Sequence, residues 1–240
     1  MNFKTAIVVG ASSGIGRELV RKLAKAGVKT AAIARRIDRL NELAEEFPGM
    51  VIPVQHDVAN FDEVPELFMK ITEQIGGLDM FIYNAGVMPE VDPSEFNFEK
   101  DKQMIDVNIS GAVAWCNAAA DRFQHTKHGS LIGIGSVAGD RGRQGQPVYN
   151  ASKAFLHTYF EALRNRLSRH GVTVVTIKPG PTATEMTAHM QATMMPADVA
   201  ARIILSKANN NGEHYLKPVH RLIFYIIKRI PSPVFRKLKI

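Results

Sequence analysis

The strongest constraint on the fold of this chain is a glycine-rich turn near its N-terminus. Residues 4–9 form a short apolar run rich in β-branched side chains, which indicates a buried strand. Gly10, Gly14 and Gly16 follow at once, and residues 17–27 then carry apolar side chains at helical spacing. In a strand–turn–helix unit the backbone N–H groups and the helix dipole both face the turn. The segment therefore predicts a nucleotide phosphate site, although a plain loop is the alternative for a glycine-rich turn taken alone.

The rest of the chain alternates between strand and helix patterns. This alternation predicts a single Rossmann-like, doubly wound α/β domain, with a parallel sheet of about seven strands flanked by helices. Strands are expected at residues 4–9, 29–34, 51–55, 79–83, 129–134, 172–177 and 214–216. Helical patterns include residues 17–27, 62–75, 100–123 and 149–170.

Four motif positions come just after expected strands. They are Gly10, Asn84, Ser136 and Pro179. Ligands of open parallel sheets bind beyond the carboxyl ends of the strands, where the strand order reverses. The four positions are therefore expected to surround one site.

Tyr149 and Lys153 lie four residues apart, so a helix places them one turn apart on the same face. A nearby ammonium group favours the phenolate and lowers a tyrosine pKa that is otherwise about 10. Such a tyrosine can exchange a proton with a carbonyl or alcohol oxygen, while Ser136 donates a second hydrogen bond to the same oxygen. Taken alone, a Tyr and a Lys one turn apart are also common on solvated helices.

With these motifs in order, the chain resembles the short-chain dehydrogenase/reductase (SDR) family up to about Leu216. The resemblance rests on elements that follow the family's order. They are the Gly10/Gly14/Gly16 turn, Asp57-Val58, Tyr83-Asn84-Ala85-Gly86, Asn108, Ser136, Tyr149-x-x-x-Lys153, Pro179-Gly180 and Thr184. Tyr83 stands where the family more often has Asn.

The resemblance implies a catalytic set of Asn108, Ser136, Tyr149 and Lys153. Asn108 would interrupt helix geometry and hold a water that links Lys153 to solvent. The positions implied to bind the cofactor are Gly10, Ser12, Ser13, Gly14, Ile15, Gly16, Arg35, Arg36, Asp57, Val58, Asn84, Ala85, Gly86, Tyr149, Lys153, Pro179, Gly180, Thr182 and Thr184. Asp57 and Val58 would contact the adenine, though Asp57 is also a candidate N-cap for a helix starting near Asn60.

The end of the second strand indicates the cofactor. An acidic residue there hydrogen-bonds the ribose 2′-hydroxyl of NAD, whereas an arginine accommodates the 2′-phosphate of NADP. This chain has Arg35 and Arg36, with no acid before Asp38. NADP(H) is therefore expected over NAD(H), mainly through Arg35. Arg36 can also be a solvated residue at a helix start, and the turn position Ser13 is neutral.

Composition supports one domain in a reducing compartment. A chain of 240 residues with 45% hydrophobic content can bury one core. The single cysteine, Cys116, excludes an intramolecular disulfide framework, and no signal peptide is evident. A cytoplasmic homodimer or homotetramer is expected. No metal is expected, because His125 and His128 have no cysteine or carboxylate that would complete a metal site.

A methionine-rich segment, where the family has a mobile lid, is expected to contact the substrate. It contains Met186, Met190, Met194 and Met195. Methionine adapts to irregular apolar shapes, so Met186 and Met190 together with Ser136 and Tyr149 predict a hydrophobic substrate site. Packing of these methionines onto the body is the alternative.

Residues 217–240 form a tail distinct from the domain at residues 1–216. The seven Lys and Arg after Glu213 equal the entire formal net charge of +7, and no acidic residue follows Glu213. Residues 222–227 are continuously apolar. This pattern fits a peripheral contact with anionic lipid, and an arm that packs on the body or on another subunit is the alternative. Nucleic-acid binding is not expected, because no recognition module is present.

Together these features predict an NADP(H)-dependent oxidoreductase that interconverts a small-molecule carbonyl and a secondary alcohol, with Tyr149 as general acid/base. The alternative is a dinucleotide-binding regulatory or scaffold protein whose chemistry is vestigial. Such proteins usually lose the tyrosine or the lysine, and this chain keeps both.

Overall fold

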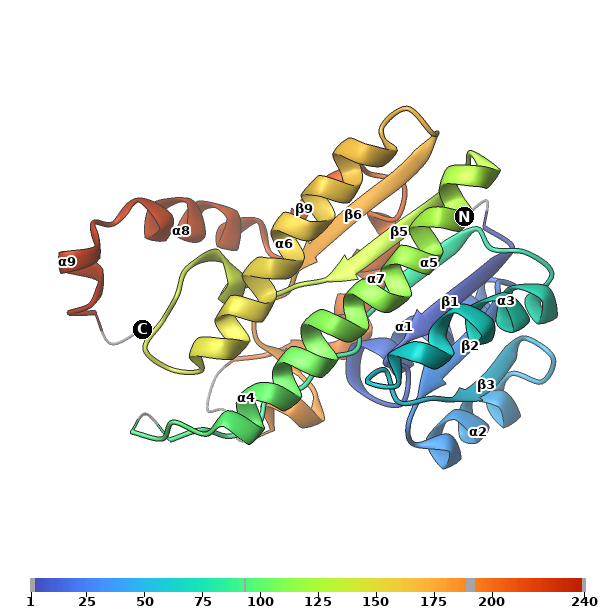
Figure 1. The fold of residues 1–240 in the computed structure, drawn as a ribbon, viewed down its shortest axis with the longest axis horizontal. Helices are drawn as coiled ribbons and strands as arrows, with labels where there is room; N and C mark the ends of the chain where they lie inside the picture. Colours follow the sequence, from blue (N-terminus) through green and yellow to red (C-terminus); the bar gives the residue numbers. More distant parts are fainter. Residues whose placement is uncertain (1–2, 93, 189–192, 239–240) are drawn as a thin grey trace.

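The protein, described by a computed structural model over residues 3–92, 94–188 and 193–238, contains a parallel seven-stranded sheet (Figure 1). The strand order is β3-β2-β1-β4-β5-β6-β9. These strands are β1 Thr5–Val9, β2 Lys29–Ala34, β3 Val51–Gln55, β4 Met80–Tyr83, β5 Gly129–Ile134, β6 Val172–Lys178 and β9 Gly212–Tyr215. The order reverses between β1 and β4, which makes the fold doubly wound and confirms the predicted class.

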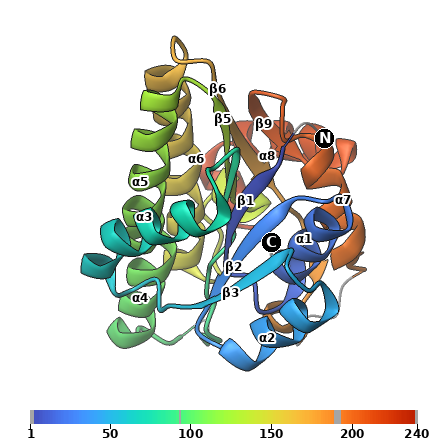
Figure 2. The ribbon, with the colours of Figure 1, turned by 90° about the vertical axis from the view of Figure 1, so that its right-hand side faces the viewer.

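Helices cover both faces of this sheet (Figure 2). On one face lie α1 Gly14–Lys25, α2 Ile37–Glu46 and α7 Ala197–Ser206. On the other lie α3 Val64–Ile75, α5 Gly111–Thr126 and α6 Pro147–Leu167. Every residue of β1 is buried, because its alternate side chains enter the two separate cores. This explains why the strand reads as a continuous apolar run.

The expected helix at residues 100–123 is interrupted in the structure. It consists of α4 Phe98–Ile105, a π-helical turn η2 Asp106–Ser110, and then α5. Asn97 begins α4 as an N-cap whose side chain accepts a hydrogen bond from the Lys100 N–H. The π turn shifts the helical phase at Asn108, a type of irregularity that is frequent at functional sites.

A short excursion follows β6 before the last strand. It includes β7 Thr182–Ala183, the 3₁₀ turn η4 Glu185–Thr187 and β8 Met195–Pro196, which pairs with β7. The last strand, β9, begins two residues before the expected start at residue 214. Met195 is buried in the core with α7, so for this residue the packing alternative is right.

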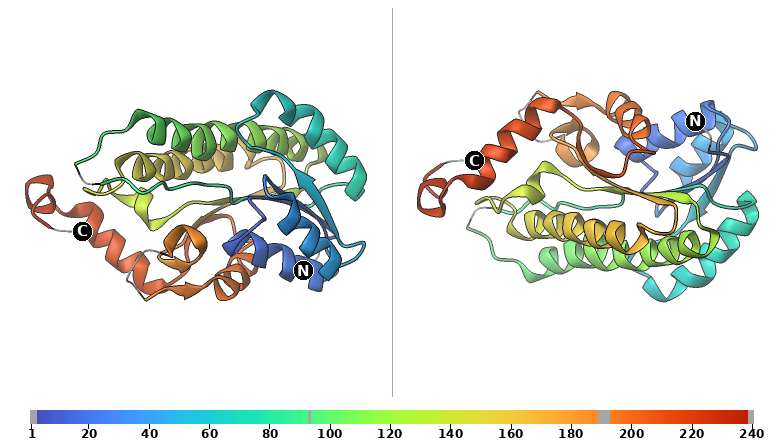
Figure 3. Two further views of the ribbon diagram at one scale, coloured as in Figure 1. Left: turned by 90° about the horizontal axis from the view of Figure 1, so that it is seen from below. Right: turned by 90° about the horizontal axis from the view of Figure 1, so that it is seen from above.

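Beyond β9 the chain forms an arm that projects past the end of the sheet (Figures 1 and 3). This C-terminal arm, residues 217–238, contains α8 Pro218–Arg229 and the short helix α9 Ser232–Phe235. Pro218 is at the first turn of α8, where its missing N–H costs nothing. No helix in the described part of the chain has the length and apolar character needed to cross a bilayer.

The arm is attached to the turn η3, Val137–Asp140, and to the residue after it. The Arg141 guanidinium donates to the carbonyl oxygens of Ile227 and Lys228, both at 3.0 Å, at the end of α8. It also stacks over the Phe235 ring, 4.4 Å from its centroid. The Lys228 Nζ lies 2.7 Å from the Asp140 carboxylate, which is fully buried. The arm therefore has a fixed orientation on the body.

Candidate active site

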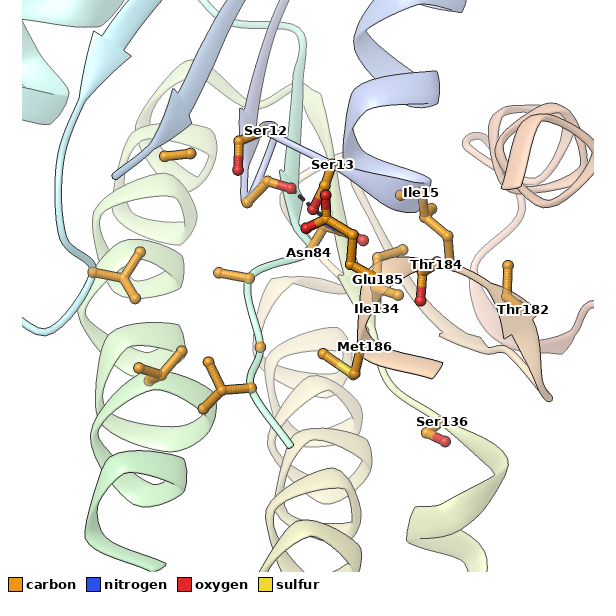
Figure 4. Close-up of a pocket in the computed structure, with 18 of the residues that line it drawn as sticks. Ser12, Ser13, Ile15, Asn84, Ile134, Ser136, Thr182, Thr184, Glu185 and Met186 are labelled. Carbon is orange, nitrogen blue, oxygen red and sulfur yellow. Dashed lines mark hydrogen bonds between the residues drawn. The ribbon is translucent and has the colours of Figure 1, made fainter. Parts of the chain in front are cut away.

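One cleft at the carboxyl edge of the sheet gathers most of the expected site residues (Figure 4). The expected residues that line it are Gly10, Ser12, Ser13, Gly14, Ile15, Arg35, Arg36, Asp57, Val58, Asn84, Ala85, Gly86, Ser136, Tyr149, Lys153, Pro179, Gly180, Thr182, Thr184 and Met186. Gly16 and Asn108 lie behind the lining. Met190 is outside the described residues.

The turn after β1 approaches neighbouring backbone too closely for larger residues. A Cβ on Gly16 would lie 2.0 Å from the Gly10 carbonyl oxygen, and Gly10 itself has φ +85°. The Asn84 side chain donates to the same Gly10 oxygen at 2.8 Å and ties the turn to β4. No side chain caps the start of α1 at Ser13. The helix N-terminus, with its free N–H groups, can therefore accept a phosphate.

The two arginines after β2 are placed differently. Arg36 donates to Ser12 and Ser13 of the turn and pairs with Glu185 of η4 at 2.8 Å. Arg35 is 59% exposed, and its guanidinium pairs only loosely with Asp57 at 3.7 Å. Both line the cleft, and Arg35 has the freer guanidinium for a new anion contact.

Asp57 does not cap a helix. Its Oδ1 accepts a hydrogen bond from the Ala59 N–H at 3.1 Å, and Asn60 is the N-cap of the following 3₁₀ turn, η1 Phe61–Glu63. Asp57 and Val58 thus shape the loop after β3, at the side of the cleft where Arg35 lies.

Ser136, Tyr149 and Lys153 meet at the other end of the cleft. Ser136 follows β5 and caps η3, with its Oγ accepting from the Ala138 N–H at 3.0 Å. Tyr149 and Lys153 come from the first two turns of α6 and are both buried. The Lys153 Nζ donates to the Ile134 carbonyl oxygen at 3.2 Å and lies 5.6 Å from the Tyr149 ring centroid.

The pKa of Tyr149 is set by groups other than Lys153. Burial raises it above the ordinary value, while a hydrogen bond with Ser136 and the charge of Arg143 act in the opposite direction. Burial lowers the pKa of Lys153 to about 8. The expectation that Lys153 lowers the Tyr149 pKa is therefore wrong, because burial is the largest influence on this phenol and raises its pKa.

Asn108 supports this set from behind. Its Oδ1 accepts a hydrogen bond from the Val87 N–H at 2.8 Å, and its Nδ2 donates to the Val87 carbonyl oxygen. The same Nδ2 also donates to Ser152 Oγ at 3.2 Å. A Cβ on Gly86 would lie 3.4 Å from both Asn108 Oδ1 and Lys153 Nζ, which shows how close the two side chains are. The π turn at Asn108 is the interruption of helix geometry that the family resemblance implied, whereas the sequence pattern predicted an unbroken helix.

Three further residues were not predicted. Glu185 lines the cleft and joins Arg36 to Arg39, and its place between Thr184 and Met186 was the only signal in the sequence. His56 lines the cleft and packs edge-on against Trp115. Arg143 acts on Tyr149 from a loop whose path has no signature in the sequence.

Comparison with known proteins places this cleft in a family. The family model described as short chain dehydrogenase matches residues 4–195. An uncharacterized oxidoreductase of Myxococcus xanthus (strain DK1622) is 40% identical over 191 residues, which cover 78% of this chain and 76% of that protein. An uncharacterized oxidoreductase of Staphylococcus aureus (strain USA300) is 32% identical over 225 residues, covering 90% and 97%.

Solved structures share the fold. A serine dehydrogenase in a closed form complexed with NADP⁺ has a TM-score of 0.84 and 27% sequence identity, covering 90% of this chain and 95% of its own. A short chain dehydrogenase from Burkholderia cenocepacia J2315 in complex with NADP has a TM-score of 0.85 at 22% identity, covering 98% and 97%. The second likeness shows the fold alone.

Proposed function

Because this chain belongs to the short-chain dehydrogenase family and is an oxidoreductase, we propose that it transfers a hydride between NADP(H) and a carbonyl or secondary alcohol. The observation that carries the proposal is the single cleft that joins the glycine turn after β1 to Ser136, Tyr149 and Lys153. The end at the glycine turn is suited to bind a dinucleotide, and the end at Tyr149 is suited to transfer a proton to a substrate oxygen.

The residues of this chain fit the dinucleotide. The turn after β1 has the uncapped N-terminus of α1 for the phosphates, and Gly10 and Gly16 admit no side chain there. Arg35 and Arg36 line the same cleft and are suited to a 2′-phosphate, which supports NADP(H) over NAD(H). The NADP-bound serine dehydrogenase, 27% identical to this chain, supports the same choice.

When bound, the nicotinamide supplies or accepts the hydride. In the direction of reduction, Tyr149 protonates the substrate oxygen as general acid, and Ser136 donates a hydrogen bond to the same oxygen. A positive Lys153 favours the phenolate that remains and orients the nicotinamide ribose. Asn108 keeps the start of α6 in place through Ser152 and, we propose, supports the resupply of protons.

We propose a hydrophobic substrate for this site. Met186 lines the cleft from η4, and the apolar side chains of Val87 and Ile134 line it as well. Flexible thioether and aliphatic surfaces accommodate apolar groups of varied shape. A turnover screen with NADPH and NADH across hydrophobic ketones and aldehydes, with sugars as polar comparators, tests this part.

Substitution of Tyr149→Phe tests the reaction assignment. The variant should lose about 10²–10⁴-fold in kcat, since positioned acid catalysis contributes this much, while the Kd for NADPH stays unchanged. Tyr159→Phe on the same helix is the matched control, because Tyr159 bonds Asn117 and does not line the cleft. Retention of more than about a tenth of the wild-type kcat would refute the role of Tyr149.

A dinucleotide-binding protein without chemistry gives a different result. It would bind NADPH with the affinity expected of the cleft and show no turnover in the screen. We also propose that the chain forms a homodimer or homotetramer, in keeping with its family, and light scattering after size exclusion measures this directly.

A further inference from the structure

The outer face of the C-terminal arm is apolar, and none of the residues that the structure describes covers it. Helix α8 turns His220, Phe224 and Ile227 toward the body, where Phe224 stacks on Tyr215. Its other side exposes a set of large apolar side chains between 42% and 62%. They are Val219, Leu222, Ile223, Tyr225 and Ile226. Val219, Leu222, Ile223 and Ile226 recur at spacings of three and four residues, so they form one stripe along the helix.

Basic side chains surround this stripe, and no acidic side chain lies near it in sequence. Lys217, Arg221 and Arg229 belong to α8 and its start, and Arg236 and Lys237 follow α9. Lys228 is the one described cation of the arm with an acidic partner, the Asp140 carboxylate. The arm therefore presents apolar groups within a field of positive charge, the composition of helices that bind in the interface of anionic membranes.

The length of α8 agrees with a position in the interface. Twelve residues of helix span about 18 Å, well short of the roughly 30 Å of a bilayer core. A second copy of the chain fits this surface less well. In a symmetric contact the same patch meets itself, so the cations of two arms would face each other with no carboxylate of either arm between them.

From this face we propose that the C-terminal arm docks the enzyme on an anionic lipid surface. The contacts of Arg141 and Asp140 fix the arm directly behind η3, the turn that Ser136 caps. Docking through α8 therefore sets the orientation of the catalytic cleft relative to the lipid. The binding step itself does not depend on the proposed reaction.

Vesicle flotation with the full-length protein tests the proposal. The wild-type protein should float with phosphatidylcholine vesicles that contain a third phosphatidylglycerol at low salt, and should stay unbound with phosphatidylcholine alone. Leu222→Asp should weaken binding at least tenfold, because Leu222 is 62% exposed at the middle of the stripe. Arg221→Gln should weaken it about fivefold, the effect of one cation near the surface.

Met69→Asp is the matched control. Met69 is 64% exposed and belongs to α3. Helix α3 lies at the opposite end of the molecule from the arm (Figure 1), and Met69→Asp introduces the same charge as Leu222→Asp. Its binding should equal that of the wild-type protein. All three variants should keep the wild-type melting temperature and NADPH affinity, so a loss of flotation cannot come from misfolding.

Three outcomes would overturn the proposal. The first is no flotation of the wild-type protein with the anionic vesicles. The second is an equal loss for Leu222→Asp and Met69→Asp. The third is that Leu222→Asp converts an oligomer to a monomer in light scattering while its flotation stays unchanged. This result would assign the apolar face to a contact between subunits. None of these depends on turnover, so failure here is separate from failure of the proposed reaction.

Discussion

Replacement of Arg35 by alanine should weaken NADPH binding while leaving NADH binding nearly unchanged. Arg35 follows the last residue of β2, lines the cleft, and has a guanidinium whose nearest acidic group is Asp57 at 3.7 Å. Arg36, by contrast, is already bonded to Ser12 and Ser13 in the turn after β1 and to Glu185. A 2′-phosphate would therefore take its new charge-assisted contact mainly from Arg35.

The size of the effect follows from the exposure of this side chain. Hydrogen bonds to charged groups contribute about 1.5–3 kcal/mol. Since Arg35 is 59% exposed, solvent screening favours the low end of this range. Release of the loose Asp57 pair offsets little, because exposed ion pairs contribute about 0–1 kcal/mol. Arg35→Ala should therefore weaken NADPH by about 1–2 kcal/mol, or roughly 5–30-fold in Kd.

Calorimetric titration of both cofactors at low salt measures this. NADH lacks the 2′-phosphate, so its Kd should change less than about twofold in Arg35→Ala. Arg202→Ala, on the exposed side of α7 and away from the cleft, should leave both affinities unchanged. Equal losses for NADPH and NADH would show that Arg35 does not contact the 2′-phosphate. A loss for NADPH that does not shrink as salt rises would contradict the electrostatic origin.

Three further substitutions test other parts of the structure. Gly16→Ala should abolish cofactor binding in a titration and lower the melting temperature, because its Cβ would lie 2.0 Å from a backbone oxygen. Burial lowers the pKa of His157 to about 3, so its stabilising effect is present above pH 6.5 and is lost as the pH falls. In urea unfolding, the free energy of unfolding should fall between pH 7 and pH 5 by about 1–2 kcal/mol less in His157→Gln than in the wild-type protein. The same fall in both proteins would contradict this. Asp140→Ala should cost about 1.5–3 kcal/mol in unfolding free energy, because the buried Lys178 ammonium loses this carboxylate and keeps only that of Glu213. It should also make the arm sensitive to protease, and a variant with wild-type stability would show that the ion cluster is not needed.

The sheet was predictable because its strands carry their own signals. The ranges expected for β2, β3 and β5 agree with the structure to the residue, since buried parallel strands read as apolar, β-branched runs. The single long helix expected across α4 and α5 was wrong in detail. A π turn adds one residue to a helical turn without changing the composition, so periodicity cannot find it.

The arm was only half predictable. Its positive charge and its apolar run were evident from the sequence, but the helix α8 was not predicted from that run. A continuous apolar segment has no helical periodicity, and the second face of α8 is defined only by what it packs against. The start of the helix at Pro218 was the one local signal.

The candidate site divides in the same way. Order along the chain was enough to expect Ser136 at the same edge as Gly10, because each follows a strand end. Tyr149 and Lys153 were expected on one helix face from their spacing, and the family resemblance joined them to Ser136. The burial of the Tyr149 side chain, which raises its pKa, was not predictable from the sequence because it depends on the whole fold. The influence of Arg143 on Tyr149 arises from the path of a loop, and loops leave little trace in sequence patterns.

The buried carboxylate of Asp140 also bears on the order in which the protein is made. Its partners are Lys178 in β6 and Lys228 near the end of the chain. Synthesis proceeds from the N-terminus, so the glycine turn, β1 and α1 emerge first and can fold while translation continues. The ion cluster under the Ser136 turn is complete only once the arm has left the ribosome. A chain that ends before Lys228 therefore has the turn after β1 and the N-terminus of α1, but its Ser136 turn is without one of the cations that anchor it.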